Sequence, residues 1–124
     1  MISVEIEFTT KTVLGLTEGQ CRRCEYSDYS GRMDEMVKWI KKAISNENIR
    51  RPMITFSYYN DARTRDIGTA RIIGEWCNQY DLVTWDDRGQ VTSQIKNIKV
   101  DAKLIKRLYM ECVDRMNAYE EQVG

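Results

Sequence analysis

Aromatic and arginine side chains of the kind that bind nucleotides gather in the middle of the sequence. Tyr59 precedes a polar stretch that carries Arg63 and Arg65, and Trp76 follows in the next apolar run. Aromatic planes stack on nucleobases, and the planar guanidinium group binds phosphate oxygens through paired hydrogen bonds. These residue types predict a nucleotide-binding surface. The alternative is that the aromatic rings fill the core and that the arginines are solvated in a charged hairpin loop.

Arg107 and Arg115 complete the predicted ligand-binding set. Both lie on the flanks of a predicted C-terminal helix that also carries Lys103 and Lys106. A small charged ligand is held tightly only where a pocket offers bidentate phosphate contacts. We therefore assign the aromatic side chains to an adenine base and the arginines to a pyrophosphate.

Groups for catalysis are scarce in this chain. Histidine, the usual base of a nucleophilic triad, is absent from all 124 residues. The segment 68–74 lacks the GxxxxGK pattern of a phosphate-binding loop. Asp86 and Asp87 are adjacent carboxylates, but Gly89 just after them favours a tight turn over a divalent-metal site. The sequence predicts a binding protein without catalytic residues, cofactor or metal, and a small nucleotide-processing enzyme is a further alternative.

Four cysteines, Cys21, Cys24, Cys77 and Cys112, set the expectation for redox and metal chemistry. The first two form a CxxC pair, whereas a four-ligand zinc site usually needs a second pair or histidines. Cys112 falls on an apolar helix face, where cysteine behaves as a small hydrophobe. The N-terminus lacks the basic start and long apolar core of a signal peptide, so we expect reduced thiols and a cytoplasmic protein.

The elements that must position these side chains are mostly strands. Alternation of apolar and polar residues predicts a first strand over 2–9, which we expect at a sheet edge or paired with a second subunit. Four further runs separated by turn residues predict an antiparallel meander or a small, strongly bent barrel. They cover residues 54–59, 70–76, 82–85 and 91–98. Pro52 is expected at the first position of its strand, where its missing donor costs least.

Two helices are expected to cover this sheet. Apolar residues at helical spacing predict one over 32–45 and another over 102–121, with Asp101 as the N-cap of the second. The wide apolar face of the terminal helix suggests one contact with its own sheet and one with a partner chain, so we expect a homodimer or higher oligomer. Residues 10–31 have weak periodicity and are interpreted as a connection, in which 13–16 could extend a hairpin.

Length and composition bound the fold class. A chain of 124 residues with 42% apolar side chains and one proline predicts a single globular domain over 1–124, of the α+β class, with about five antiparallel strands. Lys plus Arg and Asp plus Glu both number 19, and this zero net charge weighs against a duplex nucleic acid partner. No run approaches the roughly 18–20 apolar residues of a membrane span.

The segment from Pro52 to Asp101 resembles the small bent sheets of YolD-like and WYL-type modules. The shared pattern comprises the strands ITFSYYN, GTARIIGEW and DLVTW, the turn DDRG, and the strand QIKNIKV that enters a helix. It covers about fifty of the 124 residues. The resemblance implies a module that binds nucleic acid, nucleotides or a protein partner.

The whole chain is also similar in length and layout to phage anti-defence proteins that sequester the Thoeris signal, a cyclic ADP-ribose isomer. Those small proteins combine an antiparallel sheet and two helices in a dimer with ligand pockets. The resemblance implies a phage-encoded, non-catalytic protein that sequesters a cyclic nucleotide immune signal in the host cytoplasm. The alternative is a YolD-like, WYL-like or anti-CRISPR-like adaptor that binds single-stranded nucleic acid or a protein.

Overall fold

The described residues form one antiparallel sheet of six strands with two helices. The computed structural model describes residues 2–11, 17–26, 32–47, 49–59, 66–74 and 79–123, of which the side chains of 9–11, 17–26 and 122–123 are left aside. The elements in chain order are β1 (Ile2–Lys11), β2 (Thr17–Tyr26), α1 (Met33–Ile44), β3 (Ile49–Tyr59), β4 (Asp66–Gly74), β5 (Tyr80–Trp85), β6 (Val91–Ile95) and α2 (Ala102–Val123). The strand order is β2-β1-β3-β4-β5-β6, so the sheet is open and the α+β prediction is confirmed.

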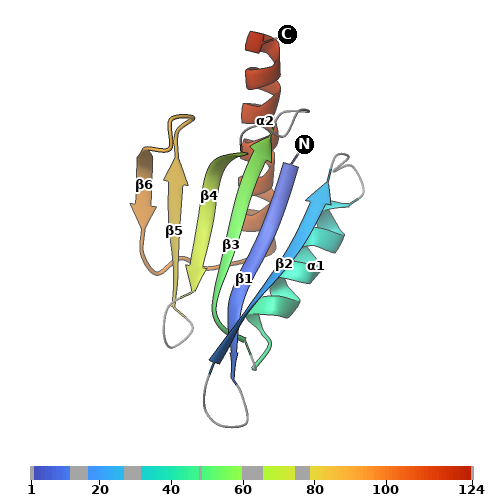
Figure 1. Cartoon of the computed structure of the whole chain (residues 1–124), viewed down its shortest axis with the longest axis vertical. Helices are drawn as coiled ribbons and strands as arrows, with labels where there is room; N and C mark the ends of the chain where they lie inside the picture. Colours follow the sequence, from blue (N-terminus) through green and yellow to red (C-terminus); the bar gives the residue numbers. More distant parts are fainter. Residues whose placement is uncertain are drawn as a thin grey trace.

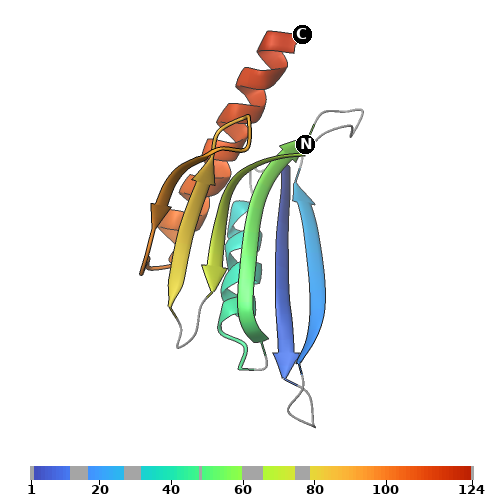
Figure 2. The ribbon, with the colours of Figure 1, turned by 60° about the vertical axis from the view of Figure 1, so that its left-hand side comes forward.

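Both helices lie on the same face of the sheet, and the opposite face carries no helix in the part of the chain that the structure describes (Figures 1 and 2). The core fills the space between that face and the helices, because alternate strand positions supply apolar side chains to it. The core side chains with a relative exposure of 1% or less include Ile2, Val4, Ile6, Ile54, Phe56, Ile72, Met36, Ile40, Ile105 and Leu108.

Helix α2 begins where the sequence predicts. The Asp101 carboxylate accepts a hydrogen bond from the Leu104 amide at 2.9 Å, and this caps one of the free donors of the first turn. Ile105, Leu108 and Cys112 are buried against the sheet. The apolar stripe that we expected to serve both sheet and partner is therefore packed on the chain's own core. The oligomeric state stays a prediction.

The N-terminal part of the sheet differs from the expectation. Strand β2 occupies much of the stretch that we interpreted as a connection, and it pairs with β1 from Ile2↔Tyr26 to Lys11↔Thr17. Its sequence, TEGQCRRCEY, has no apolar alternation, as is tolerated by a strand at a sheet edge. Strand β1 lies between β2 and β3 and is not an edge strand. Residues 13–16, the possible hairpin extension, lie outside the described residues.

Pro52 lies inside β3 and not at its first position. The pairing of β1 with β3 changes register between Glu7 and Thr9, and Arg51 in this bulge has a φ of 51°. A bulge leaves an unpaired position, which accommodates the missing amide hydrogen of proline within a strand. Gly74 of β4 packs closely on this proline, because a Cβ there would lie 2.6 Å from Pro52 Cδ.

Among the described residues, no helix is long and apolar enough to cross a membrane.

Candidate functional site

A groove runs between the β5–β6 edge of the sheet and helix α2. It consists of two adjoining pockets of about 290 and 500 Å³, which share Leu82, Ile95 and Arg107. Leu82 and Ile95 are cross-strand partners, so their side chains form a common apolar floor. We call this feature the α2–β6 groove and define it by the residues that line the two pockets.

The smaller pocket is the hydroxyl end of the groove. The Thr84 hydroxyl lies 2.8 Å from that of Thr92 and 2.5 Å from that of Ser93. A register shift between Thr84 and Trp85 explains this geometry, because a bulge sets two residues of β6 opposite one residue of β5. The Glu111 carboxylate on α2 also lines this pocket and forms a 3.7 Å ion pair with Arg107.

The larger pocket is the cationic end of the groove. Lys99, Lys103 and Arg107 line it, with Asp101 as its only acidic residue among the described lining. The Asp101 carboxylate is already engaged with the α2 amide group, as described above. The apolar part of the lining is contributed by Leu82, Ile95, Ile98 and Leu104. An apolar floor with three cations around it is suited to a flat or apolar group that carries negative charge.

The link between β6 and α2 sets the position of Lys99. The Ile98 amide donates to the Tyr80 carbonyl at 2.9 Å, and the Asn97 amide donates to the Asp81 carboxylate at 3.2 Å. Asn97 has a φ of 58°, a conformation that asparagine tolerates better than most residues. Hydrogen bonds to β5 therefore fix the backbone beside Lys99, whereas Lys103 and Arg107 are positioned by α2.

Arg115 closes the far end of the groove, but its guanidinium group is already engaged. It donates to the Trp85 carbonyl at 2.6 Å and to the Asp87 carboxylate at 2.5 Å. Tyr58 donates to the same carboxylate oxygen at 3.3 Å, and burial followed by the nearby Asp87 charge raises the pKa of Tyr58 to about 12. Tyr58 and Asp87 thus tie β3 and the β5–β6 turn to α2. The contacts of Arg115 give it a structural role, which limits its capacity to bind a ligand.

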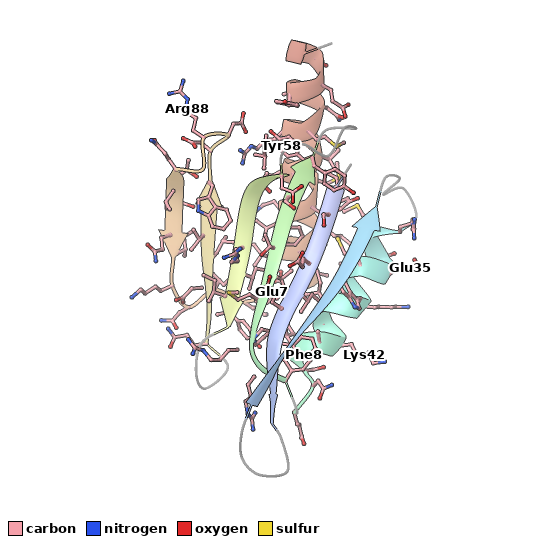
Figure 3. The ribbon with its side chains drawn as sticks, viewed as in Figure 1. Glu7, Phe8, Glu35, Lys42, Tyr58 and Arg88 are labelled. Atoms are coloured by element: carbon pink, nitrogen blue, oxygen red, sulfur yellow. The ribbon has the colours of Figure 1, made fainter. Side chains whose placement is uncertain are left out.

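The β5–β6 turn has the form that its sequence predicts. The Asp86 carboxylate accepts hydrogen bonds from the amides of Arg88 and Gln90, both at 2.9 Å, and Gly89 has a φ of 79°. Figure 3 shows Arg88 at the tip of this turn, pointing away from the sheet. Asp86 therefore serves the turn, as predicted.

The helix-free face of the sheet presents a second group of polar side chains. The Arg71 guanidinium carbon lies 5.4 Å from the centre of the Trp85 ring, and Arg71 Nε donates to the Thr55 hydroxyl at 2.9 Å. Glu5 and Glu7 come from β1 on the same face, where Glu7 is labelled in Figure 3. A hydrogen bond with Glu5, with burial and the Glu5 charge, raises the pKa of Glu7, and Arg71 partly opposes this shift. Two carboxylates beside the arginine make this face a poor match for a polyanion.

The structure separates the predicted site residues. Arg107 lines both pockets, and Arg115 lines the smaller one. Tyr59 is buried at 3% exposure, adjoins Tyr58 in β3 and lines neither pocket, so the structure does not bring it to the two arginines. Arg63, Arg65 and Trp76 lie outside the described residues. Tyr59 lies outside the hydrophobic core cluster that includes Tyr58, and its burial speaks against a stacking role.

The residues that sequence reasoning missed come mostly from β5, β6 and the link to α2. Segment 96–107 holds five basic residues and one acidic residue, a net charge of +4 in a chain of zero net charge. That local excess of positive charge could be recognised in the sequence. The hydroxyl cluster of Thr84, Thr92 and Ser93 could not, because it depends on a bulge between two strands.

The CxxC pair lies on β2, at backbone positions opposite Val4 and Glu7. Those two partners alternate across the sheet, with Val4 in the core and Glu7 exposed. The backbone positions of Cys21 and Cys24 therefore belong to opposite faces of the strand. Among the described residues, no group of three or more acidic or cysteine side chains could hold a metal ion. Cys112 is a buried free thiol, and burial raises its pKa to about 11.

Comparisons with protein-family models, with curated proteins and with solved structures found no match to this chain.

Proposed function

We propose that this chain is a non-catalytic binding protein that sequesters a nucleotide in the α2–β6 groove. The observation that carries the proposal is the cationic end, where Lys99, Lys103 and Arg107 surround an apolar floor. A nucleotide combines a flat base with negative charge. The base fits the apolar floor, and the negative charge fits the cations around it. The described polar cluster on the helix-free face lacks this match, because Glu5 and Glu7 accompany its arginine.

The ligand that we propose first is a cyclic ADP-ribose isomer. This choice follows the similarity in length and layout to phage proteins that sequester the Thoeris signal. On this proposal the protein acts in the cytoplasm of the infected cell and lowers the free concentration of the signal without altering it. A homo-oligomer is part of the same proposal, and the end of α2 that extends beyond the sheet offers one surface for it (Figures 1 and 2).

A thermal-shift panel tests the proposal. The panel contains cyclic ADP-ribose isomers, cyclic dinucleotides and trinucleotides, NAD, AMP and a short single-stranded oligonucleotide. A bound nucleotide present at about one hundred times its dissociation constant adds roughly 2.7 kcal/mol to the free energy of unfolding. The ligand recovered after denaturation should be chemically unchanged, and a cleaved product would instead indicate an enzyme.

Two variants place the ligand in the groove. Arg107→Ala should weaken binding by about tenfold or more, because a charged hydrogen bond contributes roughly 1.5–3 kcal/mol. Lys42→Ala is the matched control, since it removes one positive charge from an exposed position on α1, far from the α2–β6 groove (Figure 3). Equal affinities for the two variants would reject the groove as the binding site.

The adaptor alternative predicts a different result from the same panel. Only the oligonucleotide would bind, and its affinity would fall steeply as the salt concentration rises. A panel without any shift would point to a protein partner and would reject nucleotide sequestration.

A further inference from the structure

The two ends of the α2–β6 groove differ in charge and in hydrogen-bonding capacity. Lys99 and Lys103 line the cationic end alone, where the Asp101 carboxylate caps α2, whereas Arg107 lines both ends. At the hydroxyl end, Arg107 forms an ion pair with Glu111, and Arg115 forms an ion pair with Asp87. The hydroxyl end is therefore close to neutral, and a phosphate gains little from moving there.

The three hydroxyl groups at the hydroxyl end have more acceptor than donor capacity left for a ligand. Thr84, Thr92 and Ser93 carry three hydroxyl protons and six lone pairs, and their two mutual hydrogen bonds use two of each. One proton and four lone pairs remain for a ligand. The Glu111 carboxylate, 56% exposed, adds acceptors only. A phosphate is also an acceptor, so these hydroxyl groups and Glu111 favour a ligand group that donates hydrogen bonds. The guanidinium groups of Arg107 and Arg115 in the same lining are paired with carboxylates.

We infer that the α2–β6 groove recognises a phosphorylated ribose, with the phosphate at Lys99 and Lys103 and the sugar hydroxyls at Thr92, Ser93 and Glu111. Arg107 lines both pockets and stands between the two groups. This inference rests on the proposed function and narrows its ligand to ribonucleotides over their deoxy counterparts. Glu111 is the residue that sets this preference, because its carboxylate accepts from the hydroxyl that a deoxy sugar lacks.

Paired sugar phosphates test the inference without a base. The chain of 14.6 kDa is small enough for amide NMR titration, which also registers weak binding. Ribose 5-phosphate should bind about tenfold more tightly than 2-deoxyribose 5-phosphate, because the missing hydroxyl leaves a charged acceptor without its partner. The amides of Thr92, Ser93 and Glu111 should shift with the ribose compound.

Glu111→Gln should reduce the ratio of the two affinities to below about threefold, while both compounds still bind through the cationic end. Glu120→Gln is the matched control, because Glu120 is exposed on α2 and lines neither pocket, and it should keep the wild-type ratio. Both positions are exposed, and the dispersion of the amide spectrum confirms that each variant is folded.

Three results would overturn the inference: equal affinity for the two sugar phosphates, shifts confined to the cationic end, or no binding of either compound. If nucleotides still stabilise the protein in those cases, sequestration stands and only the sugar preference is rejected. A nucleotide panel without any shift rejects the proposed function itself.

Discussion

The Nη2 atom of Arg115 lies 2.5 Å from Oδ1 of Asp87, which ties the middle of α2 to the turn between β5 and β6. Nη1 of the same side chain donates to the Trp85 carbonyl. The two walls of the α2–β6 groove are therefore held together at one end by a single guanidinium group. Arg115 was predicted from the sequence as a phosphate ligand, and its engaged nitrogens give it a structural role that the sequence did not reveal.

Arg115→Ala should lower the free energy of unfolding by about 1–3 kcal/mol, because it leaves the partly buried Trp85 carbonyl without this donor and removes the charged partner of Asp87. Urea unfolding monitored by circular dichroism measures this change. Arg88→Ala in the same turn is the control and should stay within about 0.5 kcal/mol of the wild type, since Arg88 is exposed. Similar losses in the two variants would contradict the structural role of Arg115.

Alkaline pH should destabilise the protein through Tyr58. Its pKa rises from an ordinary value of 10.0 to about 12, first because of burial and then because of Asp87. The folded state keeps a proton that the unfolded state loses, so this contribution is fully present below pH 10 and is lost as the pH rises through 12. Tyr58→Phe should show a shallower loss of stability in this window. Parallel pH profiles for the two proteins would disprove the assignment.

Asp101 stabilises the fold as a helix cap but opposes anion binding at the cationic end, and two substitutions can separate these effects. Asp101→Ala should cost about 0.5–2 kcal/mol of stability, because the Leu104 amide loses its cap. Asp101→Ser should keep the cap and most of the stability. Both variants remove the acidic residue of the cationic end and should therefore bind AMP more tightly than the wild type. Calorimetric titration measures the affinity, and weaker binding by the stable Asp101→Ser variant would refute the predicted charge preference.

Gly74→Ala should destabilise the sheet where β4 meets the β3 bulge. The added Cβ would lie 2.6 Å from Pro52 Cδ and 2.8 Å from the Pro52 carbonyl oxygen, so the backbone must shift at a cost of about 1–3 kcal/mol. Gly68→Ala in the same strand is the control, because its Cβ would meet the Trp85 ring at an ordinary 3.5 Å. In thermal unfolding, the melting temperature of Gly74→Ala should be well below that of Gly68→Ala. The reverse order would contradict the close approach of β4 to Pro52.

The candidate site was predictable only in part. Arg107 was identified because an arginine on a helix flank is a plausible phosphate ligand, and it lines both pockets. Tyr59 was grouped with it through residue type, but adjacent residues of a strand point to opposite faces, and Tyr58 is the one that faces α2. Glu111 was not singled out, because a surface glutamate gains meaning only from the hydroxyl groups of β5 and β6.

The sequence by itself determined the elements whose signals are local. Alternation specified β1 and β3, helical spacing specified α1 and α2, and the side-chain chemistry of Asp101 and Asp86 specified a cap and a turn. Tertiary structure alone decided the rest. The position of edge strand β2 follows from its pairing with β1. The α2–β6 groove forms where strands β5 and β6 meet helix α2. Such contacts depend on register and packing between segments far apart in the chain, which a local pattern does not encode.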